Sequence, residues 1–276
     1  MSWRNLVSAV AVVGLCGGAV AVATVAQSTT DTGAVAADSA AVRDFLRAAR
    51  LSCPMVTAGD DEPVVAAASV PGTPGQDVPG TVVINGSDGK PLTRIAVPGA
   101  TAQTTKGGTR VVAEGGLAPG LVSAQVVTDR RGEGKGLASA PCANPAAESW
   151  FIGGGAAAGQ RSVLRLTNST GSDSSVDVTA YGKGGQLEVS GDDGISVAAG
   201  ETVAVGLDTL AQGTEQIAVR VRTRVGLIAA AVTDERMEGL TPMGADVIGD
   251  AGAPDKSVVL AGLPAGAGTR ELQVLA

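Results

Sequence analysis

The chain has 276 residues, a net charge of −7, 40 glycines, 13 prolines and no histidine. The absence of histidine excludes Ser-His-Asp and Cys-His catalysis and most zinc sites. The acidic balance argues against nucleic acid as a partner, because phosphate contacts need a basic surface.

The first predicted element is an apolar segment at the N-terminus. Residues 6–26 carry no charge, and about 20 such residues suffice to cross a bilayer as a helix. Arg4 precedes the segment and the next basic residue is Arg43, so the positive-inside rule leaves the rest of the chain outside the cell. A cleaved signal peptide is the alternative, because small residues precede Ala26 and Ala36. We therefore expect a single-pass cell-membrane protein, or a protein secreted after cleavage.

A stalk and a short helix are predicted next. Residues 27–38 are small and polar. Asp38 or Ser39 is suited to capping a helix that ends at Arg50, and apolar residues recur there at helical spacing. The segment 27–50 is therefore predicted to connect the anchor to the first folded domain.

Two cysteines flank the first strand-rich segment. Cys53 precedes it and Cys142 follows it. Outside the cytoplasm such a pair indicates a disulfide, with two separate buried thiols as the alternative. Cys16 is the third cysteine, and the bulky Leu15 before it disfavours lipidation.

Short apolar runs alternate with turn residues from Pro54 onward. This pattern predicts an all-β fold of tandem immunoglobulin-like β-sandwiches behind the transmembrane helix, with domains at residues 51–145 and 146–250. The predicted strands are 64–70, 81–85, 92–97, 109–113 and 121–128 in the first domain, and 150–152, 161–167, 175–181, 186–189, 202–207, 216–224 and 226–233 in the second.

The two halves repeat short motifs. Val127-Thr128-Asp129 is echoed by Val232-Thr233-Asp234. Residues 257–260 and 270–274 repeat the pattern of 149–152 and 161–166. Residues 251–276 are therefore predicted to be the start of a third repeat, or a swapped strand.

Several segments together resemble a known family. They are SWFIGGGAAAGQRSVLRLTNSTGSDSSVDVTAYGKGG, VAAGETVAV, VRTRVGLIAAAVTD and the SCP and APC cysteine motifs. The sequence resembles an uncharacterised actinobacterial family of exported envelope proteins, known only as a domain of unknown function. The resemblance implies an envelope location, often with glycosyltransferase genes nearby, and supplies no catalytic residues.

Three patterns that suggest chemistry have simpler interpretations. The glycine-rich run 153–159 precedes a strand, whereas a phosphate-binding loop needs a helix after it. Asp192 and Asp193 offer fewer oxygens than calcium requires and are typical of a turn. Asp129 and Asp234 fall in different domains, so they are not expected to act as a carboxylate pair. No catalytic, metal-binding or cofactor-binding residues are predicted.

One strand carries the sharpest candidate site. Arg220, Arg222 and Arg224 share the same parity, and Arg165 is a candidate neighbour. Three guanidinium groups in a row could hold an anionic polymer or a lipid headgroup. The alternative is a solvated face paired with residues such as Asp177 or Glu201.

The aromatic residues 150, 151 and 181 are predicted either to fill the core or to form a sugar-stacking platform.

We expect a non-enzymatic extracytoplasmic envelope protein acting as a scaffold or interaction module. The alternative is a binding module for an anionic or glycan envelope polymer. The expected partners are the membrane, through residues 6–26, and an envelope protein or polymer, with no nucleic acid.

Overall fold

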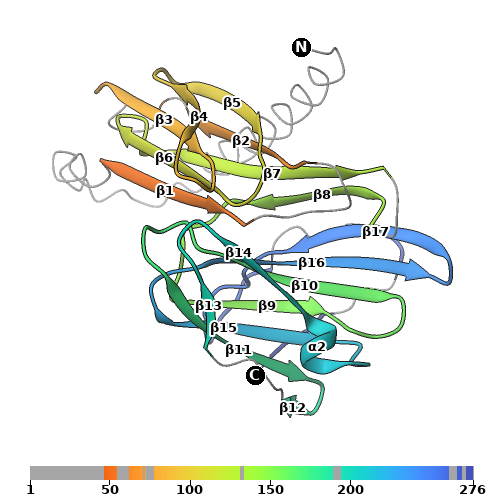
Figure 1. Cartoon of the computed structure of the whole chain (residues 1–276). Helices are drawn as coiled ribbons and strands as arrows, with labels where there is room; N and C mark the ends of the chain where they lie inside the picture. The colour runs from red at the N-terminus through yellow and green to blue at the C-terminus, as the bar shows by residue number, and fades with distance from the viewer. Residues whose placement is uncertain are drawn as a thin grey trace, which may run out of the picture.

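The computed structural model of the chain describes residues 47–54, 62–70, 72, 78–130, 134–188, 194–260, 266–268 and 272–275. Within them the chain is all-β, as predicted, with its longer strands arranged in four small antiparallel sheets (Figure 1). The predicted anchor 6–26, Cys16 and the stalk lie outside the described residues. In the part that the structure describes, no helix has the length and apolar character needed to cross a bilayer.

The first two sheets enclose one core. One sheet has the order β1 (Ala48–Cys53), β6 (Thr109–Gly115), β3 (Gly80–Asn85), β4 (Pro91–Ile95), and the other has the order β5 (Gly99–Thr104), β2 (Val64–Ser69), β7 (Leu121–Asp129), β8 (Gly136–Pro141). Their shared core is aliphatic and small, with Val65, Val82, Ile84 and Val111 fully buried. Burial of alternate residues along each strand produces this core. We call these two sheets the first pair.

The next two sheets, the second pair, enclose a larger core. One has the order β12 (Gly185–Gln186), β11 (Ser174–Gly182), β15 (Ile217–Val225), β9 (Glu148–Gly154), with β13 (Ile195–Val197) also on β11. The other has the order β14 (Thr202–Gly206), β10 (Gln160–Thr167), β16 (Ala229–Glu238), β17 (Thr241–Ile248). Phe151, Leu164, Leu166 and Ile217 are buried between them, together with Leu207 from the short helix α2 (Leu207–Ala211).

Both pairs have the same strand order. The order β1-β6-β3-β4 corresponds to β9-β15-β11-β12, and β5-β2-β7-β8 corresponds to β14-β10-β16-β17. The echoed Val-Thr-Asp motifs lie on the corresponding strands β7 and β16. Sequence motifs and topology therefore repeat together.

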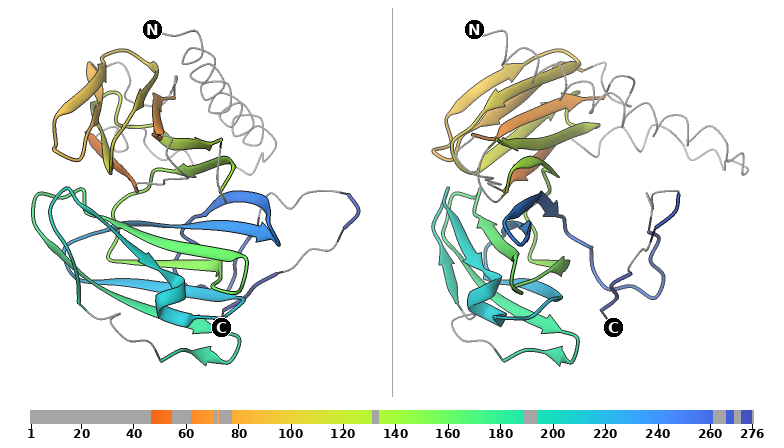
Figure 2. Two further views of the ribbon diagram at one scale, coloured as in Figure 1. Left: turned by 45° about the vertical axis from the view of Figure 1, so that its right-hand side comes forward. Right: turned by 90° about the vertical axis from the view of Figure 1, so that its right-hand side faces the viewer.

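The two pairs are in contact, and Figure 2 shows one above the other in both views. Val127, Ala138 and Ala140 of β7 and β8 are buried against Ala245 and Val247 of β17. Gly200 of the second pair comes so close to the first that an added Cβ would lie 2.5 Å from the Ser87 carbonyl oxygen. Small residues thus form these two parts of the contact.

Some predicted elements differ from the structure. The helix predicted to end at Arg50 is wrong in its last part, because Ala48–Cys53 forms β1, paired with β6 from Ala48↔Glu114 to Cys53↔Thr109. A continuous strand partner outweighs a weak helical periodicity. The strand 186–189 is reduced to Gly185–Gln186, and β5, β8 and β17 were not predicted. In the segment 251–276, predicted to start a third repeat or to be a swapped strand, the described residues 251–260, 266–268 and 272–275 contain no strand.

Candidate functional site

The candidate site lies on the solvent side of β9, β15 and β11. The register places Trp150 beside Arg220 and Arg220 beside Thr179. Two residues farther along β15, Glu148 lies beside Arg222, and Arg222 lies beside Asp177. Alternate residues of a strand face the same side, and Ile217, Val219 and Val221 of β15 are buried on the other side. We call the surface formed by Glu148, Trp150, Asp177, Tyr181, Arg220, Arg222 and Arg224 the outer face.

An arginine, a carboxylate and two aromatic rings interact at its centre. The Arg220 Nε and Nη2 atoms donate hydrogen bonds of 3.1 Å to the two carboxylate oxygens of Glu148. Glu148 Oε1 also accepts a 2.9 Å hydrogen bond from the indole Nε1 of Trp150. The Arg220 guanidinium carbon lies 5.2 Å from the Trp150 ring centroid, and the Trp150 and Tyr181 centroids are 5.8 Å apart. These contacts fix the orientation of the indole ring.

The hydrogen bonds also set the charge state of this group. The bond from Arg220, followed by that from Trp150, lowers the pKa of Glu148. The same bond raises the pKa of Arg220. Both groups are therefore charged at neutral pH.

A second ion pair lies farther along β15. Arg224 Nε is 2.5 Å from Asp177 Oδ2, and the Gly194 amide donates a 2.9 Å hydrogen bond to Asp177 Oδ1. Burial raises the pKa of Asp177, but the hydrogen bonds from Arg224 and Gly194 outweigh it and the net shift is downward. The outer face therefore carries mixed charge, as expected for a strand face with cross-strand partners.

Arg165, predicted as a neighbour of these arginines, lies elsewhere. It is on β10, in the opposite sheet of the second pair, between Ala204 and Ala231. Burial lowers its pKa. Of the four arginines predicted to lie together, the three on β15 form the cationic row and Arg165 does not belong to it.

The aromatic residues divide between core and surface. Phe151 is 2% exposed and fills the core of the second pair. Trp150 and Tyr181 are half-buried on the outer face, so core packing was the wrong expectation for them. Strand alternation required residues 150 and 151 to face opposite sides. Glu148 was missed, although the same parity relates it to Trp150.

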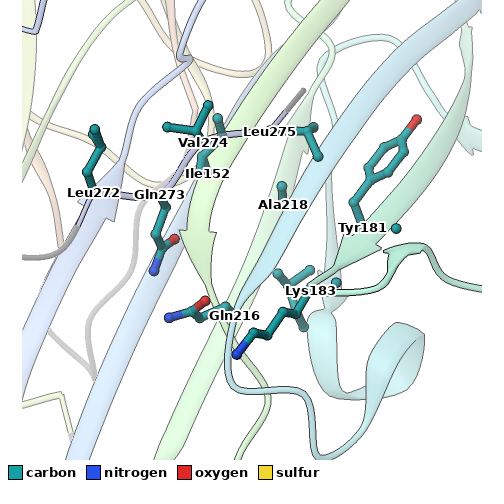
Figure 3. Close-up of a pocket in the computed structure, with 12 residues that line it drawn as sticks. Ile152, Tyr181, Lys183, Gln216, Ala218, Leu272, Gln273, Val274 and Leu275 are labelled. Carbon is teal, nitrogen blue, oxygen red and sulfur yellow. The ribbon is translucent and has the colours of Figure 1, made fainter.

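A hollow of about 360 Å³ adjoins the outer face between strands β9, β11 and β15 and residues 272–275. Figure 3 shows Tyr181 on one side of it, and Lys183 and Gln216 add polar groups to its lining. Ile152 and Ala218 contribute apolar surface. The combination of aromatic, apolar and polar groups is typical of ligand sites.

Of the echoed aspartates Asp129 and Asp234, the second has a structural role. Asp129 and Asp234 lie in different sheet pairs. The Asp234 carboxylate accepts hydrogen bonds from Ser162 Oγ at 2.5 Å, Gln160 Nε2 at 2.9 Å and Arg236 Nε at 2.7 Å. This network joins β10 to β16 and fixes the orientation of the Ser162 hydroxyl group.

A strand, β10, follows the glycine-rich run, as predicted. The run's first two glycines belong to β9, and β9 and β10 lie in different sheets, so the run is not a β-hairpin loop. Asp192 and Asp193 lie outside the described residues. Among the residues that are described, no three His, Cys, Asp or Glu side chains gather to hold a metal ion.

The predicted disulfide is present. Cys53 and Cys142 are bonded, with their Cα atoms 4.3 Å apart. Cys53 is fully buried in the core of the first pair and Cys142 is 7% exposed. The bridge therefore joins the end of β1 to the segment that follows β8.

Comparison with known families matches residues 96–276 to DUF5719, a family of unknown function. The chain belongs to DUF5719. The matched region begins just before β5 and covers every strand of the second pair. No curated protein matches the sequence.

The solved structures similar to this chain include Bacteroides uniformis β-glucuronidase 2 as a calcium-binding mutant, at 12% identity and a TM-score of 0.20. That match covers 74% of this chain and 26% of the other. Bacteroides uniformis β-glucuronidase is similar at 11% identity and a TM-score of 0.18, with coverage of 72% and 25%. The chain thus spans about a quarter of the length of these proteins, and a likeness this low carries no argument about activity.

Proposed function

We propose that the protein is a non-enzymatic envelope protein that binds a glycan polymer outside the cytoplasm through its outer face. The proposal treats residues 51–145 and 146–250 as immunoglobulin-like sandwiches and residues 6–26 as their membrane anchor. The resemblance to exported actinobacterial envelope proteins supports the location. The shared strand order of the two pairs supports tandem modules.

The single observation that carries the glycan proposal is the aromatic pair on the outer face. The chain has only five aromatic residues, and two of them, Trp150 and Tyr181, lie on this surface at 5.8 Å. An aromatic ring can pack against the apolar face of a sugar, while neighbouring charged groups hydrogen-bond its hydroxyls. Glu148 and Arg220 stand beside the rings in that arrangement.

The charge distribution favours a glycan over a polyanion. Arg220 and Arg224 are paired with Glu148 and Asp177, which leaves a small net positive charge on the face. A polyanion would have to compete with these two carboxylates. Sugar hydroxyls can instead accept from the arginines and donate to the carboxylates.

Retention on insoluble cell-wall material tests this proposal. The full chain, in nanodiscs of neutral lipid, is incubated with cell-wall glycan from its source cells. Trp150→Ala is expected to reduce retention at least tenfold. Arg161→Gln, an exposed change on β10 in the opposite sheet, is the matched control and should leave retention unchanged.

Salt dependence and crosslinking separate the alternatives. Glycan binding should change little between low and physiological salt, whereas polyanion binding falls steeply. A protein crosslinked to the outer face, without glycan retention, would indicate the scaffold function instead. Equal retention of the wild type and Trp150→Ala, with both folded by circular dichroism, would refute glycan binding at this face.

Location needs its own test. Membrane fractionation and protease treatment of intact cells should leave the chain in the membrane with its sheets accessible from outside. A soluble extracellular chain beginning after residue 26 or 36 would establish the cleaved-signal alternative.

A further inference from the structure

A second cavity lies where the two sheet pairs meet. It has a volume of about 950 Å³ and is lined by residues 48–51, Arg110, 118–121, 144–145, 169–171 and Leu227. We call it the inter-pair cleft. Its walls come from β1, β6 and the start of β7 in the first pair, the connecting segment, and two turns of the second pair. The size is within the range of small-molecule sites.

Arg110 is the polar residue at the junction. It lies on β6, where Val111 and Ala113 face the core of the first pair, so Arg110 and Val112 face the other side. The Arg110 Nη1 atom donates a 3.0 Å hydrogen bond to the Ser169 carbonyl oxygen in the second pair. The Nε atom is buried and has no hydrogen-bond partner among the described residues. Because Arg110 also lines the cleft, its guanidinium brings a positive charge to the cleft wall, where an anionic group of a ligand could pair with it.

A second arginine lies on the same side of the sheet. Arg50 of β1 also lines the cleft, is exposed, and pairs in register with Val112. Because Ser52 is opposite Arg110, Arg50 and Arg110 are diagonal neighbours, at a Cβ separation of about 7 Å in such pairs. None of the cleft-lining residues in the described part of the chain is acidic.

The rest of the cleft is mostly apolar. Val112 and Leu121 come from the first pair, and Leu227, which is 42% exposed, comes from the second. A bare inorganic anion would leave this surface exposed to water. An anion with an apolar body would cover it and gain from its burial.

We propose that the inter-pair cleft binds an amphiphile that carries a phosphate or carboxylate group. The anionic group lies at Arg110 and Arg50, and the apolar part lies along Val112, Leu121 and Leu227. Because the ligand touches both pairs, its binding stabilises their arrangement. This site is separate from the outer face and does not depend on glycan binding.

Phenyl phosphate is a suitable water-soluble probe for this cleft. It is titrated into the full chain in neutral-lipid nanodiscs, and binding is measured by calorimetry. Inorganic phosphate and benzyl alcohol provide the anionic and apolar halves separately. We expect phenyl phosphate to bind at least tenfold more tightly than either half.

Variants locate the site. Arg110→Gln is expected to weaken phenyl phosphate binding at least tenfold, and the exposed Arg50→Gln to weaken it severalfold. Arg94→Gln, an exposed change on β4 of the same sheet, is the matched control and should bind as the wild type. Because Arg110→Gln could disturb the contact between the pairs, Arg50→Gln keeps the test valid if the former does not fold.

Two results would overturn the proposal. One is equal affinity for phenyl phosphate and inorganic phosphate, which would leave the apolar wall without a role. The other is unchanged binding in both arginine variants. Adding phosphatidic acid to the nanodiscs separates the sources of the ligand: competition with phenyl phosphate indicates a lipid headgroup, and no competition indicates a soluble amphiphile.

Discussion

Replacing both Cys53 and Cys142 with alanine should destabilise the first sheet pair much more than the second. The bridge closes a loop with a sequence separation of 89 residues. The entropy lost by the unfolded chain on closing such a loop corresponds to about 4–5 kcal/mol at 25 °C. A domain of this size has about 5–15 kcal/mol of total stability, so about a quarter or more of it would be lost.

The aromatic residues allow the two pairs to be observed separately. Residues 47–145 contain no aromatic residue, and Trp150 lies in the second pair. In a Trp3→Phe background, fluorescence during urea unfolding reports only the second pair, while far-ultraviolet circular dichroism reports both. With a urea dependence of about 1–2 kcal/mol per molar, the transition of the first pair should fall by about 2–5 M and the Trp150 transition should stay in place.

Cys16→Ala is the control for replacing a cysteine that takes no part in the bridge, and it should shift neither transition. A loss below about 1 kcal/mol in the double variant would refute the loop-closure argument. Equal shifts by both signals would show instead that the pairs unfold together through the contact between β8 and β17.

Three further changes test the charges and contacts of the second pair. The hydrogen bond from Arg220 lowers the pKa of Glu148, so the ion pair stabilises the fold above pH 4.5, and this stabilisation is lost as the pH falls through the lowered pKa. Glu148→Gln should remove this pH-dependent part of the stability, which is less than about 1 kcal/mol. Unfolding experiments at pH 7 and pH 3 measure it. Asp234→Ala leaves its buried donors unsatisfied and should cost about 2–4 kcal/mol in urea unfolding, whereas Asp246→Ala, at the exposed position paired with it, should cost less than about 0.5 kcal/mol. Gly200→Ala and Gly213→Ala both place a Cβ on backbone of positive φ, but only the Cβ at position 200 meets an atom of the other pair. The backbone strain should lower the free energy of unfolding by about 1 kcal/mol in each variant, and the clash should lower it further in Gly200→Ala alone. Equal losses of stability in the two variants would count against a tight contact between the pairs.

Much of the strand content could be predicted because it depends on local pattern. Along β15, Ile217, Val219 and Val221 alternate with Arg220 and Arg222, and the alternation alone identified both the strand and its buried side. The turn between β3 and β4 is equally local, since Gly89 adopts a φ of 76° there and glycine tolerates that region. The two cysteines were paired correctly because they flank one strand-rich segment.

The candidate site could be predicted only in part. The parity of β15 predicted the arginine row, but the partners of those arginines depended on which strands lie beside β15. Strands β11 and β9 supply Asp177 and Glu148, and the latter was not recognised from the sequence. The same neighbour relation placed Arg165 in the opposite sheet, where local pattern gave no warning.

The sequence by itself determined that this chain forms short strands joined by turns and, along a strand such as β15, which side chains share a face, because these properties depend on neighbours within a few residues. Only the tertiary structure decided that Ala48–Cys53 is a strand and that β8 and β17 cover each other. The structure alone also placed Trp150 next to Arg220. It likewise placed Arg110 at the junction of the two pairs. These features arise from pairing and packing between segments far apart in the chain, and the free energy that selects them comes from contacts that no local window of sequence contains.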